Sequence, residues 1–517
     1  MLKITQIHCQ LNETLTEEQI ARKLHCRPSD ILSFSIERQS LDARHDDLHF
    51  SYTVLADLKN EEKYLRRKDV SAGQKDIYES LRPDRVPEER PVIAGFGPAG
   101  MFAGLILAEA GMKPLIIERG KCVEERTADV QRFFAEGILD PESNVQYGEG
   151  GAGTFSDGKL TTRIKNTRIH KVLEEFVEAG ADPAILYQAM PHLGTDQLQV
   201  IVRNIRNKII RLGGEIRFET RLLSLQIEND HVTGAVTNHG VIPCHEILLC
   251  LGHSAAETYE QLLGNGLQIV PKDFAAGVRV EHPQELIDRN QYGQYAGHPA
   301  LGAASYRLSH TASTGRGVYS FCMCPGGVVV PASTGAGQLA VNGMSYSQRD
   351  GKNANSAILV QIPQKDFFHD SPLDGFRFQE ELEKHAYRDG FRAPAQNIRD
   401  YLSGNHTEQW ALESSFPRGI ESTDMQVLFS NEVNQSLSEG FLDFDRKIPG
   451  FIDQGIMVGM ESRSSSPIRM PRDEHGVSVS CGGVYPCGEG AGYAGGIISS
   501  AVDGIKQAEQ VIRQYQK

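Results

Sequence analysis

The residues best suited to bind a charged ligand begin with a glycine cluster in the first third of the chain. Gly95, Gly97 and Gly100 follow the spacing G-x-G-x-x-G directly after an apolar stretch typical of a buried strand. In such a unit the first glycine permits a tight turn, the second lets the backbone approach a pyrophosphate, and the third lets the helix pack on the strand. Pro98 and Ala99 complete the turn, and we expect all five residues to contact the phosphates of a dinucleotide at the helix N-terminus.

An acidic residue stands where the second strand of this unit would end. Glu118 directly follows the apolar stretch Pro114–Ile117. A carboxylate at this place accepts hydrogen bonds from a ribose diol, and we expect its neighbour Arg119 to lie in the same site. The unit predicts a dinucleotide but does not distinguish FAD from NAD, because both cofactors use it.

A second glycine cluster ends in a lysine that imitates a phosphate-binding loop. Gly153 to Lys159 fits G-x-x-x-x-G-K, but Leu160 stands where the magnesium-binding hydroxyl belongs. No apolar strand precedes the cluster either. We therefore exclude a nucleotide hydrolase, while a cofactor-facing loop and an ordinary turn remain as alternatives.

Two arginines in a serine-rich run could hold a substrate. The guanidinium groups of Arg463 and Arg469 suit carboxylate or phosphate groups, and together with Lys159 they are our catalytic candidates. The alternative is structural pairing with Asp473 or Glu474.

We expect structural roles for several other side chains that could be reactive. Cys322 and Cys324 would share one face of a strand, as a redox pair, half of a metal site or buried structural thiols. We expect the structural role and no metal site, because no second pair with suitable spacing accompanies them. His192 and His253 are expected to pack or cap rather than to catalyse, and Cys487 lacks a basic neighbour in sequence.

The elements that must position these residues form three units. Residues 1–85 read as a small α+β module of pattern βαββ, with a polar turn at 42–47 and a helix and linker over 59–90. Residues 91–270 with 461–517 carry the glycine clusters, and helices are expected at Arg168–Ala179, Thr195–Leu212 and 496–515. Residues 271–460 form a mixed unit with strands near Phe274–Val280 and Val318–Cys324.

Composition narrows the class of protein further. The 517 residues carry a net charge of −14, which argues against a nucleic-acid or membrane partner. Nine scattered cysteines argue against a disulfide scaffold and favour a cytoplasmic protein. The apolar stretch from Pro91 to Ile117 is interrupted by charges, proline and glycines, so it is not a membrane span.

A third glycine cluster near the C-terminus resembles the flavin-binding element of glutathione-reductase-like flavoproteins. In that element an acidic residue after glycine approaches the ribitol, and the next helix N-terminus faces the flavin. The wider chain resembles bacterial FAD-dependent dehydrogenases with a distinctive C-terminal domain, described as NAD(FAD)-utilizing dehydrogenases. The segments that carry this resemblance are Gly151–Lys159, Pro191–Asp196, Tyr319–Gly327, Val341–Ser345, Glu461–Arg469 and Gly488–Gly496.

The resemblance implies FAD as cofactor and adds residues to the site. Glu489 would address the ribitol, and backbone groups near the adenine, the flavin and the phosphates would complete the contacts. These residues are Gly151, Gly153, Ser156, Asp157, Leu222, Gly252, Gly488, Gly495, Gly496 and Ile497. The implied fold is α/β: a glutathione-reductase-like Rossmann domain interrupted by an α+β substrate-side domain, after a ferredoxin-like N-terminal module.

The expected function is an FAD-dependent oxidoreductase that transfers a hydride between flavin N5 and a small, anionic substrate. One dinucleotide fingerprint is present, so NAD(P)H would act as a transient electron donor if it acts at all. Two alternatives remain: an electron-transfer or sensor protein that docks a partner protein through residues 1–85, and a flavin monooxygenase. Neither the substrate nor the oligomeric state follows from the sequence.

Overall fold

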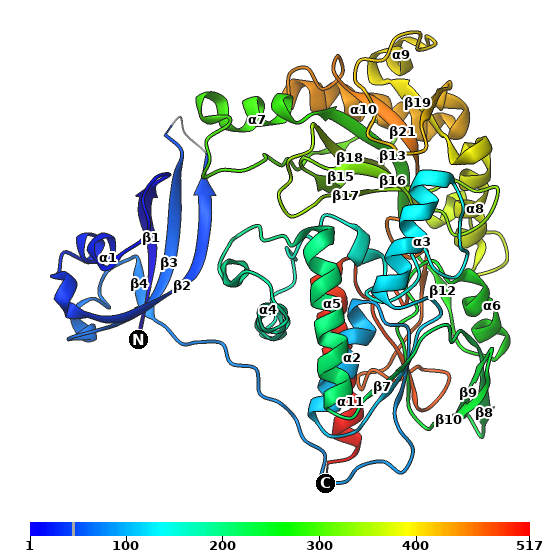
Figure 1. Cartoon of the computed structure of the whole chain (residues 1–517), viewed down its shortest axis with the longest axis horizontal. Coiled ribbons are helices and arrows are strands. Elements are labelled where there is room, and N and C mark those ends of the chain that lie inside the picture. Colours follow the sequence, from blue (N-terminus) through cyan, green and yellow to red (C-terminus); the bar gives the residue numbers. More distant parts are fainter. Residues whose placement is uncertain (44–46, 517) are drawn as a thin grey trace.

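The computed structural model describes residues 1–43 and 47–516, so half of the predicted turn at 42–47 lies outside the described residues. The N-terminal module stands beside the rest of the chain and is joined to it by an extended segment (Figure 1). Two larger units follow, a parallel sheet with helices and a seven-stranded sheet with helices. No helix among the described residues is long and apolar enough to cross a membrane.

The N-terminal module is a four-stranded antiparallel sheet with one helix. Its strands have the order β2-β3-β1-β4, and its helix α1 begins after Thr16, whose side chain accepts a hydrogen bond in a capping box. The predicted helix within 59–90 is absent from the described structure, where a 3-10 turn at Glu61–Lys63 leads to β4 and then to an extended linker. The elements are β1 (Leu2–Gln10), α1 (Glu17–Leu24), β2 (Ile31–Asp42), β3 (His49–Leu58) and β4 (Val70–Ala72).

The second unit is a five-stranded parallel sheet of order β23-β11-β5-β6-β7. Every strand is three residues long, and all but β7 are completely buried, as expected of a sheet covered on both faces. The strands are β5 (Val92–Ala94), β6 (Leu115–Ile117), β7 (Glu215–Arg217), β11 (Ile247–Leu249) and β23 (Val484–Pro486).

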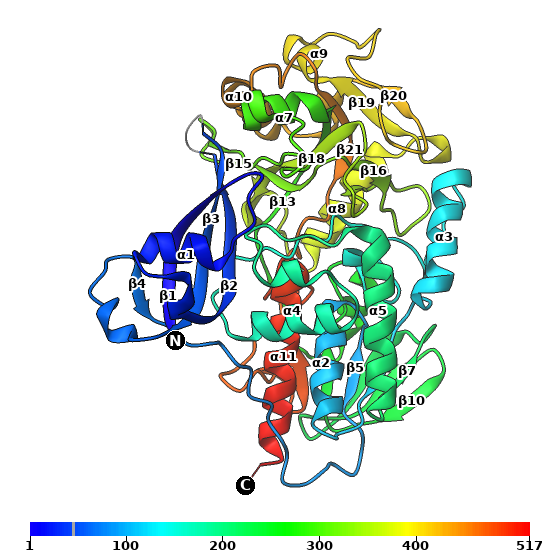
Figure 2. The ribbon, with the colours of Figure 1, turned by 60° about the vertical axis from the view of Figure 1, so that its left-hand side comes forward.

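Helices cover one face of this parallel sheet, and a small meander covers the other. Helices α2, α5 and α11 run side by side in both views and share one apolar core with α4 (Figures 1 and 2). The covering elements are α2 (Pro98–Glu109), α3 (Val123–Glu136), α4 (Arg168–Glu178), α5 (Gly194–Arg211), α6 (Ala256–Gly264), α11 (Ile497–Gln514), β8 (Leu222–Glu228), β9 (His231–Thr237) and β10 (Gly240–Pro243). The predicted helices at 168–179, 195–212 and 496–515 are thus confirmed within two residues.

The third unit is built on a mostly antiparallel sheet of order β14-β15-β18-β13-β21-β19-β20. Strands β13 and β18 lie at its centre and pair over their full length. Its elements are β13 (Phe274–Pro283), α7 (Gln284–Tyr292), β14 (Ser309–Thr311), β15 (Gly317–Cys324), β16 (Val328–Pro331), β17 (Val341–Met344), β18 (Asn353–Ile362), α8 (Asp374–Ala386), β19 (Ala393–Asn397), α9 (Ile398–Ser403), β20 (Ile420–Ser422), α10 (Asn431–Lys447) and β21 (Ile456–Glu461). The pair β12 (Val270–Pro271) and β22 (Ile468–Arg469) ties the two places where the chain passes between the units.

Candidate dinucleotide site and the adjoining thiol wall

The G-x-G-x-x-G turn joins β5 to α2 as predicted, and its three glycines have different reasons to be glycine. A Cβ on Gly95, which has a φ of 101°, would lie 2.3 Å from the Cys250 carbonyl oxygen, and one on Gly100 would lie 1.9 Å from that of Gly95. A Cβ on Gly97 would meet nothing closer than Gly151 Cα at 3.7 Å. Protein packing therefore explains the first and third glycines, while the second keeps room for a ligand at the N-terminus of α2.

Glu118 holds this turn together by accepting three backbone hydrogen bonds. Its Oε2 accepts from Phe96 N–H at 2.8 Å, and its Oε1 accepts from Gly120 at 2.9 Å and Gly148 at 3.0 Å. A carboxylate offers about four lone-pair positions, so one remains for the predicted ribose contact. The residue thus acts first as the link between the turn, β6 and the second glycine cluster.

Arg119 lies beside this link with its charge already balanced. Its guanidinium lies 3.8 Å from the ring centre of Tyr147 and pairs with Glu142 at 2.8 Å and Glu257 at 2.7 Å. A cofactor would therefore contact the flat face of the Arg119 guanidinium or the aliphatic part of the side chain, because the charge is already paired.

The second glycine cluster packs directly on the first. Gly150 donates its N–H to the Phe96 carbonyl, and a Cβ on Gly151 would approach Gly97 Cα to 3.0 Å. Arg126 of α3, which is fully buried, holds this loop from behind with hydrogen bonds to five carbonyl oxygens. These carbonyls belong to Asn144, Val145, Gly148, Glu149 and Gly151. Burial lowers the pKa of Arg126 to about 10, so the side chain still carries its charge at neutral pH.

Three predicted side chains of this loop are occupied by protein partners. Ser156 donates to the Gly153 carbonyl at 2.6 Å, and the buried Asp157 forms an ion pair with Arg349. Lys159 donates to the Met323 carbonyl of β15. Through these side chains the loop joins the parallel-sheet unit to the third unit.

The third glycine cluster opens α11 as predicted. Glycines 252, 495 and 496 have no protein atom within 4 Å of an added Cβ. Gly488 donates its N–H to Asp503, and Gly495 donates to the Ser499 hydroxyl, so Gly496 and Ile497 are the residues left to present N–H groups from the helix end. An added Cβ would thus have no protein atom within 4 Å on Gly495 and Gly496 before α11, and none closer than 3.7 Å on Gly97 before α2, an arrangement that suits a long, flat, phosphorylated cofactor such as FAD.

Glu489 pairs with a histidine that we expected only to pack. His253 Nδ1 lies 3.4 Å from the Glu489 carboxylate, while the Nε2 atom of His253 is buried without a hydrogen-bond partner. A buried polar atom without a partner next to the predicted ribitol contact fits a site completed by a bound group. Leu222, in contrast, is the first residue of β8 and its side chain is buried in the apolar core, so only its backbone is available to a ligand.

The two candidate arginines differ in whether their guanidinium groups already have protein partners. Arg463 uses Nε and Nη2 on the buried Glu383, both at 2.7 Å, and donates from Nη1 to Thr334. Its guanidinium is therefore engaged by Glu383 and Thr334 rather than by Asp473 or Glu474. Arg469 is exposed, lies 4.9 Å from the ring centre of Tyr493 and has no ion pair with any described residue. Only Arg469 can therefore offer its charge to a substrate.

The predicted thiol pair lies at the end of β15, close to Lys159. Cys322 and Cys324 end β15, next to the fully buried Arg279, which pairs with Glu461 at 3.0 Å. The described residues contain no group of three or more His, Cys, Asp or Glu residues that could hold a metal ion. Arg279 and Arg126 were not predicted from the sequence, because single arginines in apolar strands and polar helices carry no spacing signal.

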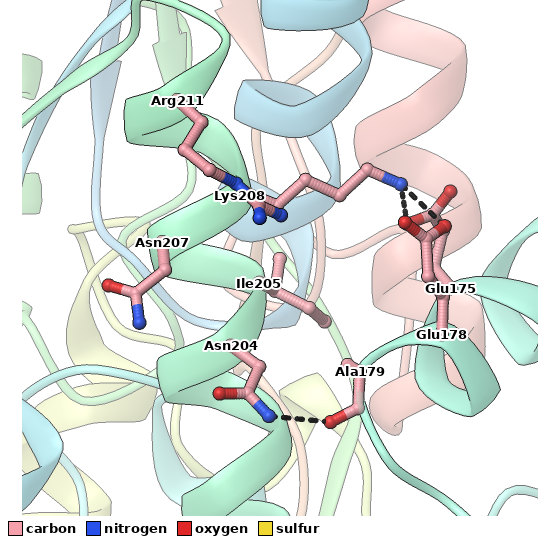
Figure 3. A pocket seen from close by; sticks show the side chains of 8 residues that line it. All are labelled: Glu175, Glu178, Ala179, Asn204, Ile205, Asn207, Lys208 and Arg211. Carbon is pink, nitrogen blue, oxygen red and sulfur yellow. Dashed lines mark hydrogen bonds and ion pairs between the residues drawn. The ribbon is translucent and has the colours of Figure 1, made fainter.

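A separate polar hollow of about 240 Å³ is lined by side chains of α4 and α5 (Figure 3). Lys208 donates to Glu175 and Glu178 at 2.7 Å each, and Asn204 donates to the Ala179 carbonyl at 2.8 Å. The hollow contains no residue of the glycine clusters, and its charges largely pair with one another. It therefore does not extend the dinucleotide site.

Comparison with known proteins places two parts of the chain in family models. Residues 273–464 match the model "FAD-dependent protein, C-terminal domain-like", and residues 1–57 match a domain of unknown function. Similar solved structures include a glycine oxidase from Bacillus cereus, with a TM-score of 0.32 and 12% identity over 83% of this chain and 96% of that chain. Another is a geranylgeranyl bacteriochlorophyll reductase-like protein from Thermoplasma acidophilum, with a TM-score of 0.37 and 12% identity over 82% and 81% of the two chains.

A relative of nearly equal length is an uncharacterised protein of Clostridium beijerinckii. It is 44% identical over 527 aligned positions, which cover 99% of both chains. The chain therefore belongs to the same protein family as this Clostridium protein.

Proposed function

We propose that this protein is an FAD-dependent oxidoreductase that acts on a small, anionic substrate. The observation that carries the proposal is the pair of helix N-termini, α2 and α11: an added Cβ would meet only Gly151 Cα, at 3.7 Å, on Gly97 before α2 and no protein atom within 4 Å on Gly495 and Gly496 before α11. The match of residues 273–464 to an FAD-dependent family supports the choice of FAD over NAD.

The chain's own residues would bind and orient the cofactor at both ends. The backbone of Gly97 to Ala99 would hold the pyrophosphate at the positive end of α2. Glu118 would fix the position of the turn and of the second glycine cluster beside it through its hydrogen bonds to both. At the other end, the N–H groups of Gly496 and Ile497 would stabilise negative charge on the flavin ring. When bound, FAD supplies hydride transfer at N5.

Arg469 is the residue that we assign to substrate binding. It belongs to β22, where it pairs with Val270 of β12, and its guanidinium has no ion pair among the described residues and lies 4.9 Å from the ring centre of Tyr493. An arginine in this state can bind a carboxylate or phosphate with two parallel hydrogen bonds. We expect Arg469→Gln to raise the KM about tenfold with little change in kcat, since a uniform binding contact of ~1.4 kcal/mol would be lost.

The test is anaerobic reduction of the flavin in the purified holoprotein. The absorbance of bound FAD is followed after mixing with NADH, NADPH or each member of a panel of carboxylated and phosphorylated metabolites. Reduction by one compound, with a rate that saturates in its concentration, is the expected result. If no compound reduces bound FAD, or if the protein binds no FAD at all, the proposal is wrong. Rapid oxygen consumption with NADPH would favour a monooxygenase instead.

A further inference from the structure

The backbone at the end of β15 has an irregular conformation around the thiols Cys322 and Cys324. Cys322 has a φ of 43°, which lies in the left-handed region, and the pairing of β15 with β18 is irregular between Phe321 and Cys324. A left-handed non-glycine residue is costly, and a bulge redirects a side chain out of the regular strand pattern. Cys322 is partly exposed, whereas Cys324 is fully buried.

Two cationic side chains converge on these thiols from different elements. Arg279 of β13 donates to the Cys322 carbonyl and lies 3.4 Å from Cys324 Sγ. Lys159 reaches over from the glycine-rich loop and donates to the carbonyl of Met323, between the two cysteines. The environment of the pair is therefore positively charged.

The nearby carboxylates are already engaged. Glu461 pairs with Arg279, and Asp157 pairs with Arg349. A buried arginine that donates to a sulfur and to the adjoining backbone stabilises negative charge at the end of the strand.

The two thiols have unequal acidity as a result. A hydrogen bond from Cys324 and the charges of Arg279 and Lys159 lower the pKa of Cys322 to about 6, against the effects of burial and Asp157. Burial raises the pKa of Cys324 well above its usual range. Of the two thiols, Cys322 is therefore the more acidic, and Cys324 is the one that keeps its proton to higher pH.

We propose that Cys322 and Cys324 form a redox-active dithiol that reduces small disulfides, with Cys322 as the attacking sulfur and Cys324 as the resolving sulfur. In the first step the Cys322 thiolate forms a bond to one sulfur of the disulfide, whose S–S bond breaks and releases a thiolate that takes a proton from water. In the second step Cys324 loses its proton and attacks Cys322 Sγ, which releases the second thiol. The protein dithiol is oxidised by two electrons, and the disulfide is reduced to two thiols.

Metal binding would use the same residue types but fits this environment less well. The two cations next to the sulfurs would repel a bound metal ion, and no third ligand stands nearby in the part of the chain that the structure describes. The same cations favour an anionic nucleophile, which is what disulfide exchange requires.

The experiment treats the full-length protein, first reduced and freed of reductant, with bis(2-hydroxyethyl) disulfide at pH 7. After acid quenching, free thiols are alkylated and each cysteine peptide is analysed by mass spectrometry. In the wild type we expect both Cys322 and Cys324 to become protected from alkylation without an added group. In Cys324→Ser we expect a hydroxyethylthio group trapped on Cys322, and in Cys322→Ser we expect Cys324 to stay free.

Cys26→Ser is the matched control, because Cys26 is also partly exposed but lies in the N-terminal module. Cys26 itself should react about tenfold more slowly than Cys322, since it lies in the N-terminal module, away from the cations Arg279 and Lys159 that favour a thiolate at Cys322. Protection of Cys322 no faster than that of Cys26, or equal reaction of Cys324 in Cys322→Ser, would overturn the proposal. Circular dichroism melting shows whether each serine variant is folded, and the exchange needs no FAD, so its outcome is independent of the function proposed above.

Discussion

Glu118 shows at the scale of one residue how the fold and the proposed cofactor site share the same atoms. Its carboxylate is about 5% exposed and accepts N–H groups from three separate segments. An amide at this position would turn an NH₂ group toward at least one of these donors. Hydrogen bonds to a charged acceptor contribute about 1.5–3 kcal/mol each, so Glu118→Gln removes a substantial part of the local stability.

We expect Glu118→Gln to lower the free energy of unfolding of the FAD-free protein by on the order of 3 kcal/mol and to weaken FAD binding. Urea unfolding and FAD titration measure the two effects. The control is Glu257→Gln, because Glu257 pairs with Arg119 at the surface, where such pairs contribute about 0–1 kcal/mol. Equal stability of the two variants would contradict the role assigned to Glu118.

Cys322 gives a second residue-scale prediction, in the form of a pH profile. Because the thiolate is the reactive form and its pKa is about 6, the rate of alkylation by iodoacetamide should rise with pH and reach half its maximum near pH 6. Lys159→Gln removes one of the cations that favour the thiolate, so its midpoint should lie at higher pH. The rate is measured on the Cys322 peptide, and a midpoint above pH 8 in the wild type would contradict the prediction.

At the scale of elements, the glycines in the turn between β5 and α2 have different roles. Gly100 is needed for the protein to pack, and Gly97 is needed for a ligand to bind. We expect Gly100→Ala to destabilise the protein, because its Cβ would lie 1.9 Å from the Gly95 carbonyl oxygen. We expect Gly97→Ala to unfold at nearly the same temperature as the wild type but to lose FAD, because its Cβ meets only Gly151 Cα at 3.7 Å and would occupy the ligand's space. Thermal melting without FAD and FAD titration distinguish the two, and normal FAD binding by Gly97→Ala would place the cofactor elsewhere.

The same scale shows which elements could be predicted. Helix α5 and strand β8 follow from regular apolar spacing, and β5 and α2 follow from the glycine turn. Helix α10 was not predicted, although Ser430 caps it and Val433, Leu437, Phe441 and Phe444 follow at helical spacing. The expected helix within 59–90 failed because charge alone carries no apolar face to pack against a core.

At the scale of the whole molecule, the glycine-rich loop joins the two large units through Asp157 and Arg349. We expect Arg349→Met to lower the free energy of unfolding by about 3–5 kcal/mol, because Asp157 would then be a buried charge without its partner. In the double variant Arg349→Met, Asp157→Asn, part of this loss should be regained. Urea unfolding measures both.

The control for the interdomain pair is Arg289→Met, whose partner Glu285 lies on the same exposed helix turn. Such a pair contributes about 0.3–0.5 kcal/mol, so this variant should resemble the wild type. If Arg349→Met were as stable as Arg289→Met, the ion pair would not hold the two units together.

The sequence by itself determined the G-x-G-x-x-G turn between β5 and α2 and the glycines at both helix N-termini, because these depend on local spacing and on backbone freedom. It did not determine which charges are free. Arg463 is satisfied by Glu383, Arg279 reaches the two cysteines, and Arg126 binds five carbonyls, all across long separations in sequence. Only the tertiary structure decided these partners, because an ion pair or a pKa depends on distance in space and on burial, neither of which a sequence pattern contains.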